Sequence, residues 1–177
     1  MTPMSNAIVA LVVIALMLTA ALTWSQAAFT SFDSVSQSLK QTVQTTQEVS
    51  RTDIKVVNAQ TQGAFVEVSV LNSGEVHLAQ FAKWDVLVQY YDAAGEYHIS
   101  QLSYTENSSP GDNQWTIVNI YTDESLGQKE IFEPGILNPG EVMLMRLSLA
   151  PLPGASTTNL VTVSSANGVA TSAQFKG

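Results

Sequence analysis

The stretch AIVALVVIALMLTAAL, residues 7–22, decides the fold of this chain because it is apolar on every side of a helix. Such a helix is typical of a membrane span or of a fully buried core helix. No Asp, Glu, Lys, Arg or His occurs between Met1 and Phe32. At about 1.5 Å of rise per residue, a helix from Pro3 to Trp24 is about 30 Å long, which matches one hydrocarbon thickness.

The predicted helix continues beyond the apolar run, since no Gly or Pro occurs between Met4 and Ser50. After Leu22, apolar residues recur at spacings of three, four or their sums, separated by Ser, Thr and Gln. They are Trp24, Ala28, Phe32, Val35, Leu39, Val43 and Val49. This spacing predicts one helix whose second half carries an apolar stripe. Because a rod of about 70 Å exceeds a bilayer, we expect the striped half to leave the membrane and pack against its own domain or against copies of itself. A partly helical, solvated stalk is the alternative, because Ser and Thr are mediocre helix formers.

The residues from Thr52 onward predict a second, all-β domain. Apolar and polar residues alternate in residues 64–71 and 83–91. Further predicted strands are residues 96–104, 114–121, 141–150, 159–166 and 169–175. Asn72-Ser73-Gly74 and Asp92-Ala93-Ala94-Gly95 predict turns that end the strands before them. Asn167-Gly168 is a strong hairpin signal, since both residues tolerate the positive φ of a type I′ turn. Seven or eight short strands at this spacing predict an immunoglobulin-like antiparallel β-sandwich. The predicted fold class is therefore α+β, with a long N-terminal hydrophobic helix over residues 1–51 and an all-β sandwich over residues 52–177.

Charge and composition exclude several classes of partner and chemistry. The 177 residues carry a net charge of −8 and the pI is about 4.5, which disfavours nucleic acid and anionic lipid headgroups as partners. There is no Cys, so disulfides, thiolate metal sites and cysteine nucleophiles are excluded. No basic residue precedes the apolar run and the first Lys is Lys40, which argues against a secretory signal peptide.

No catalytic motif is present. The chain has no G-x-S-x-G, P-loop or H-E-x-x-H pattern. His77 and His98 lie more than twenty residues apart without a patterned partner, and we interpret them as solvated or hydrogen-bonded imidazoles. Acidic residues gather at Asp112, Asp123, Glu124, Glu130 and Glu133, but no Ca²⁺-loop pattern contains them, which favours solvated loop charge over a cation site. The sequence therefore predicts no catalytic, cofactor-binding or metal-binding residue, and no enzyme.

One modification signal occurs in a predicted loop at residues 106–113. Asn107-Ser108-Ser109 matches the N-x-[ST] acceptor rule, although Pro110 directly after it lowers the odds. Asn107 is therefore a candidate glycosylation site.

This layout resembles the archaeal flagellins (archaellins) and their relatives with N-termini like those of type IV pilins. TPMSNAIVALVVIALMLTAALTW, residues 2–24, looks like such an N-terminus after prepilin-type cleavage, which removes a short basic leader. Ser5 stands where bacterial type IV pilins usually carry Glu, as is compatible with archaellins. The segments QGAFVEVSVLNSGEVHLAQFAKWDVLVQYYD (residues 62–92) and VTVSSANGVATSAQF (residues 161–175) look like the opening and closing strands of archaellum-family domains.

The resemblance implies a structural subunit of an archaellum-type motility filament, with no cofactor. Its partners would be copies of itself, the membrane before assembly, and basal motor and platform proteins. The chain would be inserted transiently in the cytoplasmic membrane and would end in an extracellular surface filament. Two alternatives share the plan, namely a membrane-anchored accessory or stator protein of the same machinery and an adhesion pilus subunit.

The apolar helix suits such an assembly on physical grounds. In the membrane its backbone hydrogen bonds are satisfied internally. In a filament, copies of the helix would replace lipid, and close packing at small residues would supply the gain. A heterologous contact that does not close would produce a helical polymer. The residues predicted to form the helical core of the assembly are Ile8, Val9, Leu11, Val12, Ile14, Leu16, Leu18, Leu22, Trp24, Phe29, Phe32, Val35 and Leu39.

Overall fold

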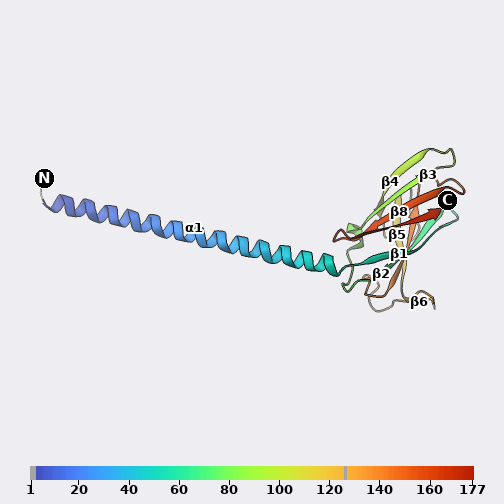
Figure 1. Cartoon of the computed structure of the whole chain (residues 1–177), viewed down its shortest axis with the longest axis horizontal. Helices are drawn as coiled ribbons and strands as arrows, with labels where there is room; N and C mark the ends of the chain where they lie inside the picture. Colours follow the sequence, from blue (N-terminus) through green and yellow to red (C-terminus); the bar gives the residue numbers. More distant parts are fainter. Residues whose placement is uncertain (1–2, 126) are drawn as a thin grey trace. The chain divides into compact units, whose positions relative to one another are not determined.

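The computed structural model describes residues 3–125 and 127–177. Residues 1, 2 and 126 lie outside the described residues, including the first two of the predicted helical segment. The chain divides into two compact units, Met1–Thr46 and Gln47–Gly177. A long apolar helix is followed by a mostly antiparallel β-sandwich (Figure 1), which confirms the predicted α+β fold class. The exact domain division at residues 51 and 52 stays a prediction.

Helix α1 (Pro3–Arg51) runs without interruption through the apolar and the striped halves. Its 49 residues give a length of about 73 Å at about 1.5 Å per residue. The many Ser and Thr residues do not break the helix, and several of their hydroxyls donate to backbone carbonyls of the preceding turn. Arg51 lies in the last turn, where a cation complements the helix dipole.

Nine strands and one short 3₁₀ helix, η1 (Phe81–Lys83), follow α1 in the described part of the chain. The strands are β1 (Ile54–Gln62), β2 (Phe65–Asn72), β3 (Asp85–Tyr91), β4 (Tyr97–Tyr104), β5 (Gln114–Asp123), β6 (Gln128–Lys129), β7 (Val142–Ser148), β8 (Thr158–Ser164) and β9 (Ala170–Lys176). Their order is β1-β2-β7-β5-β4-β3-β8-β9, with β6 paired to β5. All ladders are antiparallel except the short β4–β5 pairing, which is parallel. Strands β1 and β6 were absent from the predicted set.

The core lies between the β2-β7-β5 strands and the β4-β3-β8 strands. In the β2–β7 ladder the buried side chains face one another in register, as Val66 with Leu147 and Val68 with Met145. On the opposite side Val86 and Val88 of β3 are also fully buried. Burying such side chains contributes about 1.5–3 kcal/mol each, so the domain is held by packing without disulfides. The edge strands β1 and β9 also meet, since Thr61 Oγ1 donates to the Lys176 carbonyl at 2.7 Å.

Candidate functional site: the helix surface and two polar clusters

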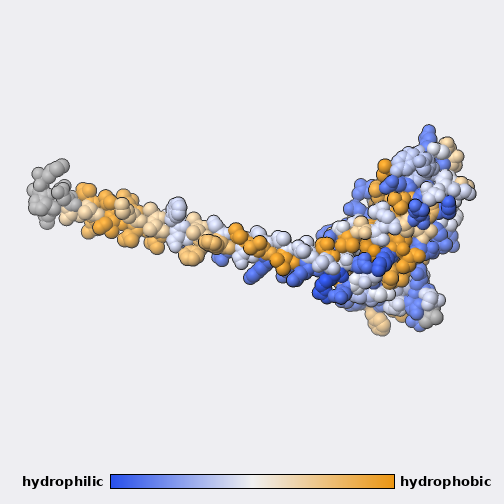
Figure 2. Space-filling model, in the orientation of Figure 1, coloured by the Kyte–Doolittle hydropathy of each residue, from blue (hydrophilic) through white to orange (hydrophobic). Residues whose placement is uncertain are grey.

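The surface of α1 is the largest apolar feature of the chain. All thirteen residues predicted to form an assembly core lie on α1 with 51–83% of their surface exposed. Figure 2 shows hydrophobic residues covering the N-terminal part of the helix, and a mixture of hydrophobic and hydrophilic residues beyond it. By length and composition α1 could cross a membrane. Such a surface requires lipid or protein to cover it, but which of the thirteen residues contact a neighbour stays a prediction.

Many hydroxyl groups of α1 are satisfied within the helix itself. Eight of them donate to a carbonyl three or four residues earlier, at 2.9–3.1 Å; these residues are Thr19, Thr23, Thr30, Ser31, Ser34, Ser38, Thr42 and Thr45. A hydroxyl that already donates loses little when water is removed from it. The helix can therefore be covered along these positions without leaving an unpaired donor.

The turn at residues 73–75 is hydrogen-bonded to the junction between the end of α1 and the start of β1. The backbone N–H groups of Ser73 and Gly74 donate to the Asp53 carbonyl at 3.0 and 2.9 Å, and the Glu75 N–H donates to the Arg51 carbonyl at 2.9 Å. Arg51 Nε and Glu75 Oε2 form an exposed ion pair at 3.1 Å. The Ser73 hydroxyl, and then Lys55, hold the pKa of Asp53 below its usual value. The junction is thus bonded through backbone and side chains.

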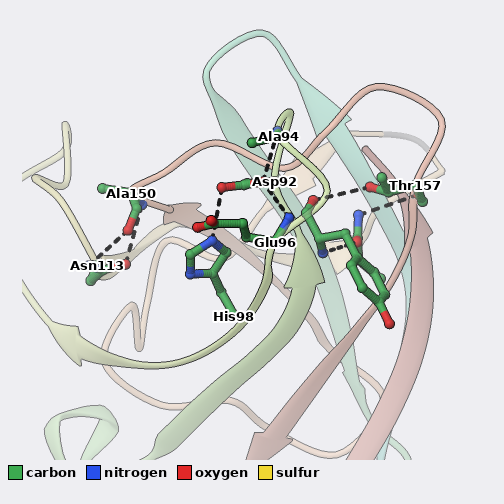
Figure 3. Close-up of polar contacts among 9 residues, drawn as sticks. Asp92, Ala94, Glu96, His98, Asn113, Ala150 and Thr157 are labelled. Atoms are coloured by element: carbon green, nitrogen blue, oxygen red, sulfur yellow. Dashed lines mark hydrogen bonds and ion pairs between the residues drawn. The ribbon is translucent and has the colours of Figure 1, made fainter.

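Besides the polar groups at the junction of α1 and β1, a second polar cluster lies at the β3–β4 hairpin. It consists of Asp92, Glu96 and His98 and is drawn in Figure 3. Asp92 Oδ1 accepts from the N–H groups of Ala94 and Glu96 at 2.9 and 2.8 Å. Asp92 Oδ2 lies 3.0 Å from His98 Nε2, and the His98 ring stacks on buried Tyr90 at 5.3 Å between centroids. The hydrogen bond from His98, followed by that from the Glu96 N–H, lowers the pKa of Asp92.

Asp92, Glu96 and His98 could together hold a metal ion. One ligand atom from each lies within 4.8 Å of the others, and a set of one imidazole and two carboxylates suits a first-row divalent ion. From the sequence we predicted no metal ligand and found no partner for His98. The predicted turn at residues 92–95 was the available signal, because hairpin pairing sets Tyr90 opposite His98 and brings the end of β3 beside the start of β4.

The other residues considered from sequence lie apart from this cluster. His77 Nδ1 lies 2.6 Å from Asn138 Oδ1, so this imidazole is hydrogen-bonded. Two acidic side chains of the predicted loop cluster accept hydrogen bonds. Glu124 Oε1 accepts from the hydroxyl of Ser69 on β2 at 2.7 Å, and Glu130 Oε1 accepts from the nearby Phe132 and Glu133 N–H groups at 2.5 and 3.0 Å. These backbone hydrogen bonds, with that of Glu133 first, hold the pKa of Glu130 below its usual value.

Asn107 lies exposed in the loop between β4 and β5. Its Oδ1 accepts from the Ser109 N–H at 3.1 Å, and its own N–H donates to Thr105 Oγ1 at 3.2 Å. Exposure is compatible with glycosylation at Asn107, which stays a prediction.

Comparison with known proteins finds similarity in structure alone. No protein-family model and no curated protein sequence matches the chain. A chain of the archaeal flagellum of Methanospirillum hungatei strain JF1 has a similar fold, with a TM-score of 0.55 and 15% identity over 98% of this chain and 92% of that one. The archaellum periplasmic stator protein FlaG from Sulfolobus acidocaldarius gives a TM-score of 0.49 and 19% identity over 70% of this chain and 99% of its own. A chain of the FlaF and FlaG stator complex from the same organism gives 0.49 and 18% over 69% and 87%. These structural neighbours are archaellum components, and the similarity to the Methanospirillum chain extends over nearly the whole length of this one.

Proposed function

We propose that this chain is a structural subunit of an archaellum-type motility filament. One observation carries the proposal: a 49-residue helix with thirteen exposed large apolar side chains at the positions expected for assembly. The fold similarity to an archaeal flagellum chain supports it, because it extends over 98% of this chain and therefore includes the helix. The role is mechanical rather than catalytic.

The proposed subunit has two working parts. Residues 1–51 lie in the cytoplasmic membrane before assembly and in the filament core after it. Residues 52–177 form the outer domain, displayed at the cell surface. Transfer of the helix from lipid to protein gains little from hydrophobicity, since lipid is already apolar, so close packing between copies supplies the stability. Basal motor and platform proteins turn the filament.

Electron microscopy of filaments sheared from the cell surface, with mass spectrometry of their main protein, tests the proposal. A shaft built from this chain, with loss of swimming when the gene is deleted, is the expected result. A chain present in few copies beside a shaft of another protein would indicate the stator or accessory role instead. Loss of surface attachment with intact swimming would indicate an adhesion pilus.

The variant Leu16→Asp probes the buried helix directly. Leu16 lies within the apolar run and is 64% exposed in the single chain. A charge at a helix centre costs about 2.5–3.5 kcal/mol in the membrane, and more when it is unpaired in a protein core, so we expect filaments to be lost. Ile131→Asp is the matched control, because Ile131 is an exposed loop residue of the β-domain. Normal filaments from Leu16→Asp would refute a core built on this helix.

A further inference from the structure

Asp33 and Lys40 are the only ionisable side chains between Met1 and Gln47. Both are exposed on α1, and no ion pair within the described chain includes either of them. Residues seven apart lie about 10.5 Å apart along a helix and within about 20° of one face. That separation exceeds the three- or four-residue spacing at which helical side chains pair. The two opposite charges therefore share a face without neutralising each other inside one helix.

The two charges border the apolar stripe at equivalent places. Asp33 directly follows Phe32, and Lys40 directly follows Leu39. Phe32 and Leu39 are 73% and 60% exposed and belong to the stripe. Charges that flank an apolar seam set partner choice and register in coiled coils. Sliding one helix past a parallel copy by seven residues brings Phe32 against Leu39 and Asp33 against Lys40 together, so the apolar and the charged patterns agree on one register.

We infer that Asp33 of one copy pairs with Lys40 of a neighbouring copy, and that this pair fixes the axial stagger between the two helices at about 10.5 Å. The inference rests on the proposed function, because it needs parallel copies of this chain. A non-zero stagger makes the contact heterologous, since each copy offers Asp33 to one neighbour and Lys40 to another. Such a contact cannot close into a dimer and instead propagates along a filament.

Other registers are worse electrostatically. Without stagger, Asp33 faces Asp33 and Lys40 faces Lys40, and like charges so placed destabilise the contact. A shift of three or four residues leaves both charges without a partner in an interface from which water is removed. Burial of an unpaired charge there costs free energy. The hydroxyl groups of Thr30, Ser34, Ser38 and Thr42 bond to their own helix and do not discriminate between registers. The charged pair therefore selects one stagger among several with similar apolar contact.

Charge reversal in the full chain, expressed in cells that make the filament, tests the pair. Asp33→Lys and Lys40→Asp alone should each lower filament yield roughly tenfold or more through like-charge contact. The double variant with both changes should recover most of the yield. Co-expression of the two single variants should also give filaments, with both chains in similar amounts. One variant then carries positive charges at positions 33 and 40 and the other carries negative charges at both. If the two chains alternate, every contact between position 33 and position 40 joins opposite charges. Glu48→Lys changes the helix charge by the same amount as Asp33→Lys and should leave the yield near wild type.

A cross-link gives a second measurement that does not depend on charge. The chain has no Cys, so a variant with both Asp33→Cys and Lys40→Cys can form disulfides only at these positions. Oxidised filaments of this variant should give a ladder of dimers, trimers and longer chains, whereas Asp33→Cys alone should stay monomeric. Absence of the ladder, or wild-type yield from both single reversals, overturns the inference while wild-type filaments remain. Failure of the wild-type chain to form filaments would instead overturn the proposed function.

Discussion

Replacing Gly74 by Ala should loosen the point where the helix joins the sandwich. A Cβ added at Gly74 would lie 2.4 Å from the Asp53 backbone nitrogen and 2.6 Å from the Arg51 carbonyl oxygen. Ordinary contact begins near 3.4 Å, so the two backbone segments must separate by about 1 Å, and neither is a flexible side-chain end. Overpacking of this kind costs about 1–3 kcal/mol.

The separation also strains the hydrogen bonds that define the junction. The N–H groups of residues 73, 74 and 75 donate across it to the carbonyls of Asp53 and Arg51, and each such bond contributes about 0.5–1.5 kcal/mol. If part of this contribution is lost together with the packing, the local cost is about 2–4 kcal/mol. Since each 1.4 kcal/mol is a factor of ten, we expect amide exchange at residues 73–75 to accelerate roughly 100-fold.

Hydrogen exchange with mass spectrometry on the full chain in detergent measures this directly. Gly135→Ala is the matched control, because nothing lies within 4 Å of its added Cβ and its φ is not positive. There the extra methyl reduces the freedom of the unfolded chain and should be neutral or stabilising by up to about 1 kcal/mol. Protection at residues 73–75 that is equal in both variants and in the wild type would refute the assignment of Gly74 as a close-packed junction residue.

Three further predictions concern the β-domain. Leu147→Ala removes a fully buried side chain and should cost about 2–5 kcal/mol of unfolding free energy, whereas the half-exposed Leu152→Ala should stay near wild type in thermal unfolding. A double-mutant cycle on the cross-strand pair of Glu67 and Arg146, joined at 2.7 Å, should give a coupling of about 1 kcal/mol; no coupling would contradict a stabilising pair. Because the folded-state pKa of Asp92 is lowered, its contribution to the unfolding free energy is present at neutral pH and is lost as the pH falls below about 3.9. The melting temperature of Asp92→Asn should therefore fall less steeply with decreasing pH than that of the wild type. Parallel curves for the two proteins would contradict this.

The strands that could be predicted from the sequence are those with one face buried along the whole strand. Trp84, Val86, Val88 and Tyr90 alternate in the sequence, and all four are buried. Strand β1 escaped prediction because it lies at the sheet edge and most of its residues are exposed, so burial imposes no strict alternation on it. Strand β6 has two residues, too few for any period to appear.

Features that join distant segments could not be predicted from local patterns. The parallel contact of β4 with β5 depends on the loop between them, across which the Thr105 N–H donates to the Trp115 carbonyl at 2.9 Å. The turn at residues 72–74 was recognised, but nothing in the sequence showed that it would bond to residues 51 and 53. Likewise the turn at residues 92–95 was predicted, whereas the approach of Asp92 to His98 required the strand register.

Helix α1 combines two kinds of interaction. Its apolar side chains attract a neighbour without fixing its axial position, and the proposed pair of Asp33 with Lys40 would fix that position. Apolar side chains attract any apolar neighbour, lipid or protein, and they alone fix neither the axial position nor the number of copies. Eight of the hydroxyls from Thr19 to Thr45 need no hydrogen-bond acceptor on a neighbour, because each already donates within the helix. Asp33 and Lys40 are then the groups of this segment for which the identity and position of a charged neighbour matter most. The proposed transfer from membrane to filament would use both properties, since the first permits transfer between two apolar surroundings and the second makes one arrangement of identical copies preferable to the rest.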